Sequence, residues 1–377
     1  MTFLIVILTL FYCLVILSFL VGIIILIKKH KKQLPSQLSD LKITIAIPAR
    51  NEEEHIENCV RSILSQENLL YIEQIIILND DSTDKTQNIL ENLATEFPII
   101  KIIQVKRDLG ENHSPKKKLI QIAVKESQTD WIALTDADCI ISSNWLEGMK
   151  NYITNESAMI CGPVEFIEEK NWFSIWQKIE FSGLMLASAG SIGIGKPTTC
   201  NAANLLIRKS MFETVNGFDG VSHIVSGDDE FLMHKFYAEN PKSVSYAFEK
   251  KTVVNTYSHK NFHDFFNQRK RWASKGLLYK SISYRLFLII IWFYHFLILS
   301  GVIYSLINQD FAFYFIICMI AKTSIDTFLI LKANYFLSKP NSIFSAVWAQ
   351  FIQIPYIVFA GFLGTFGSFT WKGVKYK

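Results

Sequence analysis

The sequence predicts an α/β domain whose sheet contains parallel strands, held at a membrane by apolar helices on both sides of it. Short apolar runs alternate with amphipathic stretches between residues 38 and 276. This alternation is typical of parallel strands joined by right-handed crossover helices. Long uncharged runs flank the region, and half of the 377 residues are hydrophobic, including 29 phenylalanines. That composition is too apolar for a purely soluble enzyme.

The first 30 residues predict a membrane anchor. Residues 2–27 carry no charged side chain, and the run exceeds the roughly 20 residues that a helix needs to cross a bilayer. The basic residues 28–32 follow the run, whereas a cleaved signal peptide carries its positive charge before the apolar run. Because basic residues prefer the cytoplasmic side, we expect the amino end outside and the following domain in the cytosol.

Residues 285–371 predict two or three further membrane helices. The runs 286–307 and 343–371 contain no Asp, Glu, Lys or Arg. Four crossings in all would leave the basic C-terminal tail outside, against the positive-inside tendency. We therefore expect one segment to be re-entrant or interfacial, and the last is the best candidate because Pro355 would break it.

A third apolar run, residues 311–331, contains Lys322 and Asp326 one helical turn apart. One interpretation is a polar contact that lines a substrate path. The other, which we favour, is an intrahelical ion pair that faces protein rather than lipid.

The cysteine spacing and the charge pattern exclude two function classes. The six cysteines show no Cys-x-x-Cys spacing, which argues against structural zinc and suits a reducing cytosol. The chain has no repeats, no low-complexity tracts and no basic stripes with interleaved aromatics. Nucleic acid is therefore not an expected partner.

The order of elements between the flanking runs follows from the apolar periodicity. The predicted strands occupy residues 42–48, 71–80, 98–105 and 130–138. The predicted helices occupy residues 53–66, 82–97 and 115–127. In sheets of this kind, ligands bind outside the carboxyl ends of the strands.

Polar, mainly acidic side chains follow three of these four strands. They lie in the segments 48–54 (PARNEEE), 79–84 (NDDSTD) and 135–138 (TDAD). Taken alone, each cluster could serve local structure, with Asn51 as a helix cap or Asp84 as a first-turn carboxylate. Three clusters on one rim favour a binding cleft.

The charges on this rim predict the kind of ligand. Carboxylates crowded at the end of a buried strand repel one another, so Asp136 and Asp138 need a positive partner. Mn²⁺ or Mg²⁺ bridging to a diphosphate would satisfy them, because such sites typically use one or two protein carboxylates. The lysines 116–118 lie at the start of a neighbouring helix, where phosphate binds well. We expect Lys116 to contact the ligand that carries the diphosphate. The alternative is that the lysines 116–118 form a solvated basic face of that helix and bind no ligand.

With these motifs the chain resembles the membrane-anchored family 2 glycosyltransferases, inverting enzymes of the GT-A fold with a Rossmann-like mixed sheet. This family includes lipid glycosyltransferases and cellulose or hyaluronan synthase-like enzymes, which transfer a sugar from a nucleotide diphosphate. The resemblance covers about residues 40–275, together with the placement of the membrane helices, and its five motifs follow in the family's order.

The resemblance implies a donor site at the ends of the first two strands. The segment IPARNEEEHI is similar to the family's opening nucleotide-binding segment. The implied donor contacts are Pro48, Arg50, Asn51 and Glu52. The segment LNDDSTDKT resembles the second acidic motif, so that Asp80 would contact the base, although Asn79 stands where a second Asp is common.

The Asp-x-Asp match at 135–138 implies that Asp138 ligates the Mn²⁺ or Mg²⁺ ion. Asp136 would lie beside the ribose and diphosphate and share in holding the metal. The segment TTCNAANLLIRKSMFETVNGFD is similar to the donor-sugar and acceptor wall, which implies sugar contacts by Asn201 and Asn204. These two could equally be ordinary loop amides.

The last two motifs concern the acceptor and the leaving group. SGDDEF resembles the acidic pair that supplies the general base, with Asp229 as the base and Asp228 in place of the commoner Glu. NQRKRW matches Gln-x-x-Arg-Trp, which implies that Arg271 approaches the diphosphate. Gln268 and Trp272 would then lie on the acceptor side.

An aromatic stretch at 171–195 has few charges. It could be an interfacial helix that delivers a lipid acceptor, since such aromatics favour the membrane–water boundary. The alternative is a core helix packed on the sheet.

The expected function is inverting transfer of a sugar from a UDP- or GDP-sugar to a lipid or polyprenyl-linked acceptor. The expected place is the cytosolic face of a bacterial cell membrane. A processive membrane polysaccharide synthase shares the motifs, but such enzymes usually carry more membrane helices. An inactive membrane scaffold is the remote alternative, because the acidic motifs and Arg271 are intact.

Overall fold

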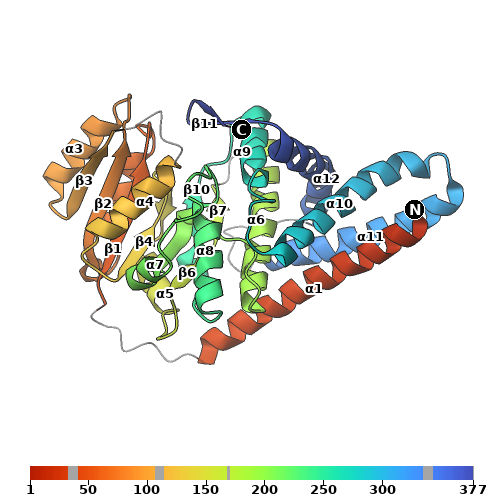
Figure 1. Ribbon diagram of the computed structural model, residues 1–377, viewed down its shortest axis with the longest axis horizontal. Helices are drawn as coiled ribbons and strands as arrows, with labels where there is room; N and C mark the ends of the chain where they lie inside the picture. Colours follow the sequence, from red (N-terminus) through yellow and green to blue (C-terminus); the bar gives the residue numbers. More distant parts are fainter. Residues whose placement is uncertain (33–40, 107–113, 168–169, 334–342, 377) are drawn as a thin grey trace. The chain divides into compact units, whose positions relative to one another are not determined.

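The computed structural model describes residues 1–32, 41–106, 114–167, 170–333 and 343–376 (Figure 1). The expected domain limit at residue 38 lies outside these residues. The chain divides into two compact units. We call Ile25–Ile167 with Gly195–Tyr257 the sheet unit, and Met1–Ile24, Glu168–Ile194 and Ser258–Lys377 the helical unit. The helical unit thus includes residues 258–276, which the sequence grouped with the domain 38–276.

The sheet unit contains a seven-stranded sheet in the order β3-β2-β1-β4-β8-β6-β9. The strands are β1 (Ile43–Ala49), β2 (Ile72–Asp80), β3 (Ile100–Val105), β4 (Trp131–Leu134), β6 (Met159–Cys161), β8 (Leu205–Arg208) and β9 (Val244–Tyr246). The first four pair in parallel, β8 runs antiparallel to β4 and β6, and β9 runs parallel to β6. The expected mixed α/β sheet is therefore confirmed.

Amphipathic helices connect the parallel strands, as the sequence predicted. They are α2 (Ile56–Leu64), α3 (Thr86–Glu96) and α4 (Pro115–Glu126). α2 buries Ile56, Cys59, Val60 and Ile63, which are spaced along one helix face. α4 begins at Pro115, where a missing backbone N–H costs nothing.

The sheet unit also contains shorter elements that the periodicity did not reveal. A second sheet has the order β5-β10-β7, with β5 (Ile140–Ile141), β7 (Val164–Phe166) and β10 (Val254–Thr256). The further helices are the short α5 (Trp145–Lys150) and α7 (Lys209–Thr214) and the longer α8 (Asp228–Glu239). The 3₁₀ turns are η1 (Leu69–Tyr71), η2 (Ala202–Asn204) and η3 (Lys250–Thr252).

The helical unit consists mainly of long helices and ends in a hairpin. Its elements are the first part of α1 (Thr2–Lys32), α6 (Trp172–Gly193), α9 (Phe262–Ala273), α10 (Ile282–Ser305), α11 (Gln309–Lys332), α12 (Ile343–Phe366), β11 (Phe369–Trp371) and β12 (Val374–Tyr376). By length and composition, α1, α10, α11 and α12 could each cross a membrane. One N-terminal and three C-terminal apolar helices therefore confirm the expected placement.

The expected break at Pro355 is wrong. α12 runs without interruption from Ile343 to Phe366 with Pro355 inside it. Proline removes one backbone donor, but packed neighbouring helices tolerate this in membrane bundles. α12 has such neighbours in α6, α9, α10 and α11.

α1 and α6 cross at backbone distance within the helical unit. A Cβ added to Gly22 would lie 1.9 Å from the carbonyl oxygen of Gly190, and one added to Gly193 would lie 2.2 Å from the carbonyl oxygen of Gly22. Glycines permit such close approach. In the middle of α6, Trp176 and Phe181 are buried, whereas Trp172 at its start is 70% exposed. The neighbours of α6 within the helical unit include α1, α11 and α12, so the middle of α6 belongs to a core of helices, whereas the core-helix alternative expected packing on the sheet.

Lys322 and Asp326 form an ion pair among the apolar helices of the helical unit. The Lys322 Nζ lies 2.7 Å from the Asp326 carboxylate, and the Lys322 side chain is fully buried. Tyr12 of α1 donates to the same carboxylate at 2.9 Å, and Gln350 of α12 contacts Lys322 at 3.4 Å. The structure thus supports the ion pair that faces protein.

Candidate active site

The carboxyl ends of β1 and β2 bring Arg50 and Asp80 together. The Arg50 guanidinium lies 3.6 Å from the Asp80 carboxylate and 3.5 Å from its backbone oxygen. Pro48 lies within β1 opposite Leu78 of β2. Because the two strands are parallel neighbours, their polar ends meet on one rim, as expected.

The loops that follow these two strands interlock. Asn51 has a φ of 51°, a left-handed conformation that Asn tolerates better than most residues. Its side-chain oxygen accepts from the Thr83 N–H at 2.8 Å. The Glu52 N–H donates to the Thr86 hydroxyl at 2.8 Å. The side chain of Asn51 thus supports the neighbouring loop after β2 rather than capping α2, whose N-cap residue is His55.

Asn79 is also used within the turn. It is 2% exposed, and its side-chain oxygen accepts from the Ser82 hydroxyl at 2.5 Å. Its amide donates to Gln87 at 2.8 Å. The amide at this position therefore organises the start of α3 from the end of β2.

A charge cluster joins the end of β4 to the start of α8. The Lys116 Nζ lies 2.6 Å from the Asp136 carboxylate and 3.4 Å from the Asp228 carboxylate. Burial by itself would lower the pKa of Lys116, but the carboxylates of Asp136, Asp228 and Asp229 raise it above its usual range. Lys116 therefore stays charged and holds two acidic motifs, far apart in the sequence, at one point.

Lys117 supports the same region from the adjacent face of α4. Its side chain is 1% exposed and its Nζ donates to the backbone oxygens of Val221, Ile224 and Ser226 at 2.8, 2.7 and 3.1 Å. The alternative of a solvated basic face is therefore wrong for both Lys116 and Lys117. Lys117 fixes the loop that leads into the acidic pair, a role that the sequence did not signal.

Asp229 lies in the first turn of α8, where the helix dipole favours a carboxylate. One carboxylate oxygen accepts from the Ala202 N–H at 3.1 Å and the other from the Glu230 N–H at 2.7 Å. Gly227 precedes the helix with a φ of 71°, which glycine adopts without strain. The carboxylate of Asp229 is therefore oriented by backbone donors from two segments, η2 and α8.

The two candidate sugar contacts behave differently. Asn201 is half-buried, and its side-chain oxygen accepts from the Ala203 N–H at 2.9 Å. Asn204 is fully buried: its amide donates to the backbone oxygens of Pro163 and Thr252, at 2.7 and 2.8 Å, and its oxygen accepts from Trp145 at 2.9 Å. These bonds occupy its polar atoms, so the environment favours the ordinary-amide interpretation for Asn204 over a sugar contact.

Gln268, Arg271 and Trp272 lie on α9, in the helical unit. Arg269, between them in the sequence, is buried and its guanidinium lies 2.5 Å from Glu180 of α6. It donates to the Gln268 oxygen at 2.5 Å, and its Cζ lies 4.2 Å from the centre of the Trp272 ring. The Gln-x-x-Arg-Trp motif is thus built around a buried arginine that sequence reasoning missed.

The residues present fit a divalent metal of the expected kind. Within the part of the chain that the structure describes, no group of three or more His, Cys, Asp or Glu side chains is arranged to hold an ion. Asp136 and Asp138, both half-buried, are hard oxygen ligands. Mg²⁺ sites on nucleotides commonly use only one or two such carboxylates and take their other ligands from phosphate and water. Two carboxylates suffice for that arrangement.

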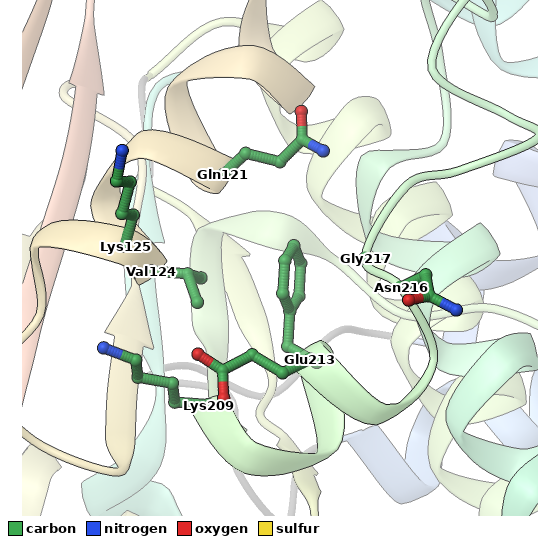
Figure 2. A pocket seen from close by; sticks show the side chains of 8 residues that line it. Gln121, Val124, Lys125, Lys209, Glu213, Asn216 and Gly217 are labelled. Carbon is green, nitrogen blue, oxygen red and sulfur yellow. The ribbon is translucent and has the colours of Figure 1, made fainter.

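A shallow hollow of about 290 Å³ lies elsewhere on the sheet unit. Figure 2 shows its lining from the C-terminal half of α4, from α7 and from the turn after α7; the labelled side chains include Gln121, Lys125 and Glu213. Lys116 lies at the opposite end of α4. This hollow is therefore separate from the acidic cluster.

Two family models match the chain. The glycosyl transferase family 2 model matches residues 44–215, and the glycosyl transferase family group 2 model matches residues 131–366. Since the second match spans more than half of the sequence, the chain belongs to the family 2 glycosyltransferases.

Curated relatives are glycosyltransferases with different acceptors. Glycosyltransferase AglE of Haloferax volcanii is 22% identical over 50% of this chain and 58% of its own length. The β-monoglucosyldiacylglycerol synthase of Nostoc sp. is 28% identical over 32% of this chain and 24% of its own. The poly(ribitol-phosphate) β-glucosyltransferase of Bacillus spizizenii is 29% identical over 34% and 20%. The chain thus spans little more than half, or less, of these relatives.

A solved structure supports the fold. The mannosyltransferase PcManGT of Pyrobaculum calidifontis, in complex with GDP-mannose and Mn²⁺, matches with a TM-score of 0.56 at 13% identity. The match covers 95% of this chain and 99% of that one. The expected GT-A fold is therefore confirmed, and the enzyme class follows from the family.

Proposed function

We propose that this protein transfers a sugar, with inversion, from a nucleoside-diphosphate sugar to a lipid or lipid-linked acceptor at the cytosolic face of a cell membrane. The observation that carries the proposal is the Lys116 bridge. It unites the Asp-x-Asp motif after β4 with the acidic pair that opens α8. A donor-binding group and a base must lie close together for a single displacement to occur between them.

Asp229 is the proposed general base. A hydroxyl group is a weak nucleophile at neutral pH and needs a base within hydrogen-bond reach. Asp229 takes the acceptor proton as the new bond forms to the anomeric carbon and the bond to the diphosphate breaks. The backbone N–H groups of Ala202 and Glu230 hold its carboxylate in place. Attack from the face opposite the nucleotide inverts the anomeric centre.

The donor side is assigned to the rim of the sheet. Asp80, beside Arg50, contacts the nucleotide base, and Glu52 and Asn51 lie on the same rim. Asp138 and Asp136 would hold Mn²⁺ or Mg²⁺, which, when bound, stabilises negative charge on the diphosphate. Lys116 and Arg271 add positive charge for the same leaving group.

The membrane helices support a lipid acceptor. Among the residues that the structure describes, four helices are long and apolar enough to span a bilayer, and one matched relative is named as a glycosyldiacylglycerol synthase. A processive polysaccharide synthase remains the second candidate, because it shares the acidic motifs and the Gln-x-x-Arg-Trp motif. Four candidate spans in the described part of the chain would leave little material for an export channel, which favours the lipid.

Incubation of membranes containing the protein with labelled nucleotide sugars and total lipid tests the proposal. We expect one donor to label a glycolipid of defined mass, and Asp229→Asn to lower the turnover by about 10²- to 10⁴-fold, the usual contribution of a general base, with nucleotide binding preserved. Asp130→Asn is the matched control. Asp130 lies just before the first residue of β4, at the end of the strand away from Asp136, and pairs with Arg208.

Three outcomes would count against the proposal. A long labelled polymer would favour the synthase. Absence of transfer from every nucleotide sugar would refute the function. Equal loss of activity and nucleotide binding in Asp229→Asn would refute its role as the base.

A further inference from the structure

The residues after α12 form a β-hairpin that packs against helix α9 of the same unit. β11 and β12 pair antiparallel with Phe369 opposite Tyr376 and Trp371 opposite Val374. The two turn residues, Lys372 and Gly373, have φ values of 48° and 79°, the combination that a two-residue type I′ turn requires. Phe369 is 4% exposed. This segment is thus an ordered element of the helical unit.

One face of α9 holds this hairpin. Asn267, Lys270 and Arg271 are spaced i, i+3 and i+4, so they lie on the same side of the helix. The Asn267 amide donates to the Thr370 carbonyl oxygen, and its oxygen accepts from the Thr370 N–H at 3.1 Å. The Lys270 Nζ donates to the Ser368 carbonyl oxygen at 3.2 Å. These are contacts to backbone atoms, so they fix the path of the strand.

The third residue on this face, Arg271, meets an aromatic ring. Its Cζ lies 5.5 Å from the centre of the Trp371 ring, a distance typical of a cation–π contact. Because a guanidinium is planar and packs on aromatic faces, contact with the indole restricts the orientations that Arg271 can adopt.

The C-terminal end of α12, just before the hairpin, lies in direct contact with the backbone of α9. A Cβ added to Gly364 would lie 2.4 Å from the Lys270 carbonyl oxygen and 2.9 Å from the Ala273 Cβ. Any side chain there would push the end of α12 away from α9. The close approach explains how Trp371, seven residues after Gly364, reaches Arg271.

The other motif residues of α9 are held separately. The Trp272 ring lies 6.2 Å from Phe181 of α6 and 4.2 Å from the Arg269 Cζ, and Gln268 accepts from Arg269. Contacts with α6 thus hold Trp272 in place, whereas the hairpin contacts Arg271.

We propose that Trp371 is a positioning residue for Arg271: its indole ring fixes the guanidinium that meets the diphosphate leaving group. This inference rests on the proposed function, in which Arg271 has that task. Trp371 itself contacts no reacting atom. It acts by limiting the orientations of Arg271, so its effect falls on the step in which the leaving-group charge grows.

A double-mutant cycle on the full-length protein in membranes tests the proposal, with Trp371→Ala, Arg271→Ala and both together. We expect Trp371→Ala to lower kcat by about 3- to 30-fold, the range that a cation–π contact supports, with a smaller change in the donor KM. Trp371→Phe, which keeps a ring, should recover most of the activity. In the Arg271→Ala background, Trp371→Ala should have little further effect, because the two residues act as one unit.

Thr370→Ala is the matched control, because Thr370 is exposed and its bonds to Asn267 are made by backbone atoms. It should keep wild-type kcat, and the thermal midpoint of each variant shows whether the hairpin stays folded. Additive effects of the two alanine substitutions, or a wild-type kcat in a stable Trp371→Ala protein, would overturn the inference while sugar transfer by the unmodified protein upheld the proposed function. Absence of transfer by the unmodified protein would instead refute the proposed function, and this inference with it.

Discussion

Lys322 of the helical unit and Lys116 of the sheet unit both contact carboxylates, but their surroundings differ. Lys322 is fully buried, and its partner Asp326 lies four residues along the same helix. The side chain of Lys116 is 18% exposed, and its partners Asp136 and Asp228 come from two distant segments. The first pair is local and closed, whereas the second joins separate parts of the chain at the rim of a sheet.

The difference indicates what each charge is for. A buried i, i+4 pair, bonded also to Tyr12 and Gln350, has its hydrogen bonds satisfied inside the bundle and fastens α1, α11 and α12 together. Lys116, by contrast, holds Asp136 and Asp228 close together at a partly open rim, although the two carboxylates repel each other. Such an arrangement is useful when the rim binds a metal and a diphosphate. We therefore expect loss of the first lysine to affect stability, and loss of the second to affect binding.

The largest effect should come from Lys322→Met. The substitution leaves Asp326 buried without its cation, and breaking one side of a buried pair typically costs about 3–5 kcal/mol. The thermal midpoint and the yield of folded protein in detergent measure this loss. The double substitution Lys322→Met with Asp326→Leu should recover most of the stability, because it removes both charges together. Wild-type stability of the single variant would contradict the structural role of the pair.

Lys116→Met should have a smaller effect, and of another kind. Loss of a charge-assisted contact to the donor would weaken nucleoside-diphosphate binding in the presence of Mn²⁺ by about 1.5–3 kcal/mol. The thermal midpoint should fall less than in Lys322→Met, since water reaches this cluster and screens its charges. Calorimetric titration with UDP and GDP measures the binding.

Lys125→Met is the matched control for that experiment, because Lys125 lies exposed in the last turn of the same helix. It should bind nucleotide as the wild type does. Unchanged nucleotide binding in Lys116→Met, with a loss of stability equal to that of Lys322→Met, would make Lys116 a structural lysine and remove the contrast.

The sequence predicted those parts of the fold that local periodicity encodes. The strands β1 to β4, the helices α2 to α4 and the acidic clusters at the strand ends follow from patterns within about 20 residues. Lys116 could be expected at the rim because a helix opens there, but the burial of Lys117 could not. Adjacent helical residues face different directions, and only the distant loop 221–226 decides what Lys117 meets.

Contacts between distant segments explain the misses. Asn204 has the chemistry of a sugar contact, yet Pro163, Thr252 and Trp145 occupy its polar atoms, and no pattern near Asn204 encodes that. The second sheet joins β5, β7 and β10 across more than 100 residues. The C-terminal hairpin carried only a weak local signal, because Gly373 suits a turn but Lys372 is not among the residues that usually precede it in two-residue turns, and its docking on α9 is again long-range.

The smallest effect concerns a carboxylate on the same rim as Lys116 that serves local structure. Asp84 accepts from the Thr86 N–H at 3.0 Å and the Glu53 N–H at 3.1 Å. Partial burial by itself would raise the pKa of Asp84, but these hydrogen bonds lower it below its usual value. Asp84→Ala should therefore cost about 0.5–2 kcal/mol, as the loss of a helix cap does. Asp84→Asn keeps an acceptor oxygen for one of the two N–H groups and loses the other, so its cost should be smaller than that of Asp84→Ala.

The pH dependence sharpens this last distinction. Because the folded-state pKa of Asp84 lies below the unfolded value of about 3.9, its contribution is present above that pH and disappears as the pH falls through the lowered folded-state pKa. The difference in thermal midpoint between wild type and Asp84→Ala should then be full at pH 7 and shrink below about pH 4. A difference that persists in acid would show that hydrogen bonding by the ionised carboxylate is not its cause, and a loss of nucleotide binding at pH 7 in Asp84→Asn would place Asp84 with Lys116 among the binding residues.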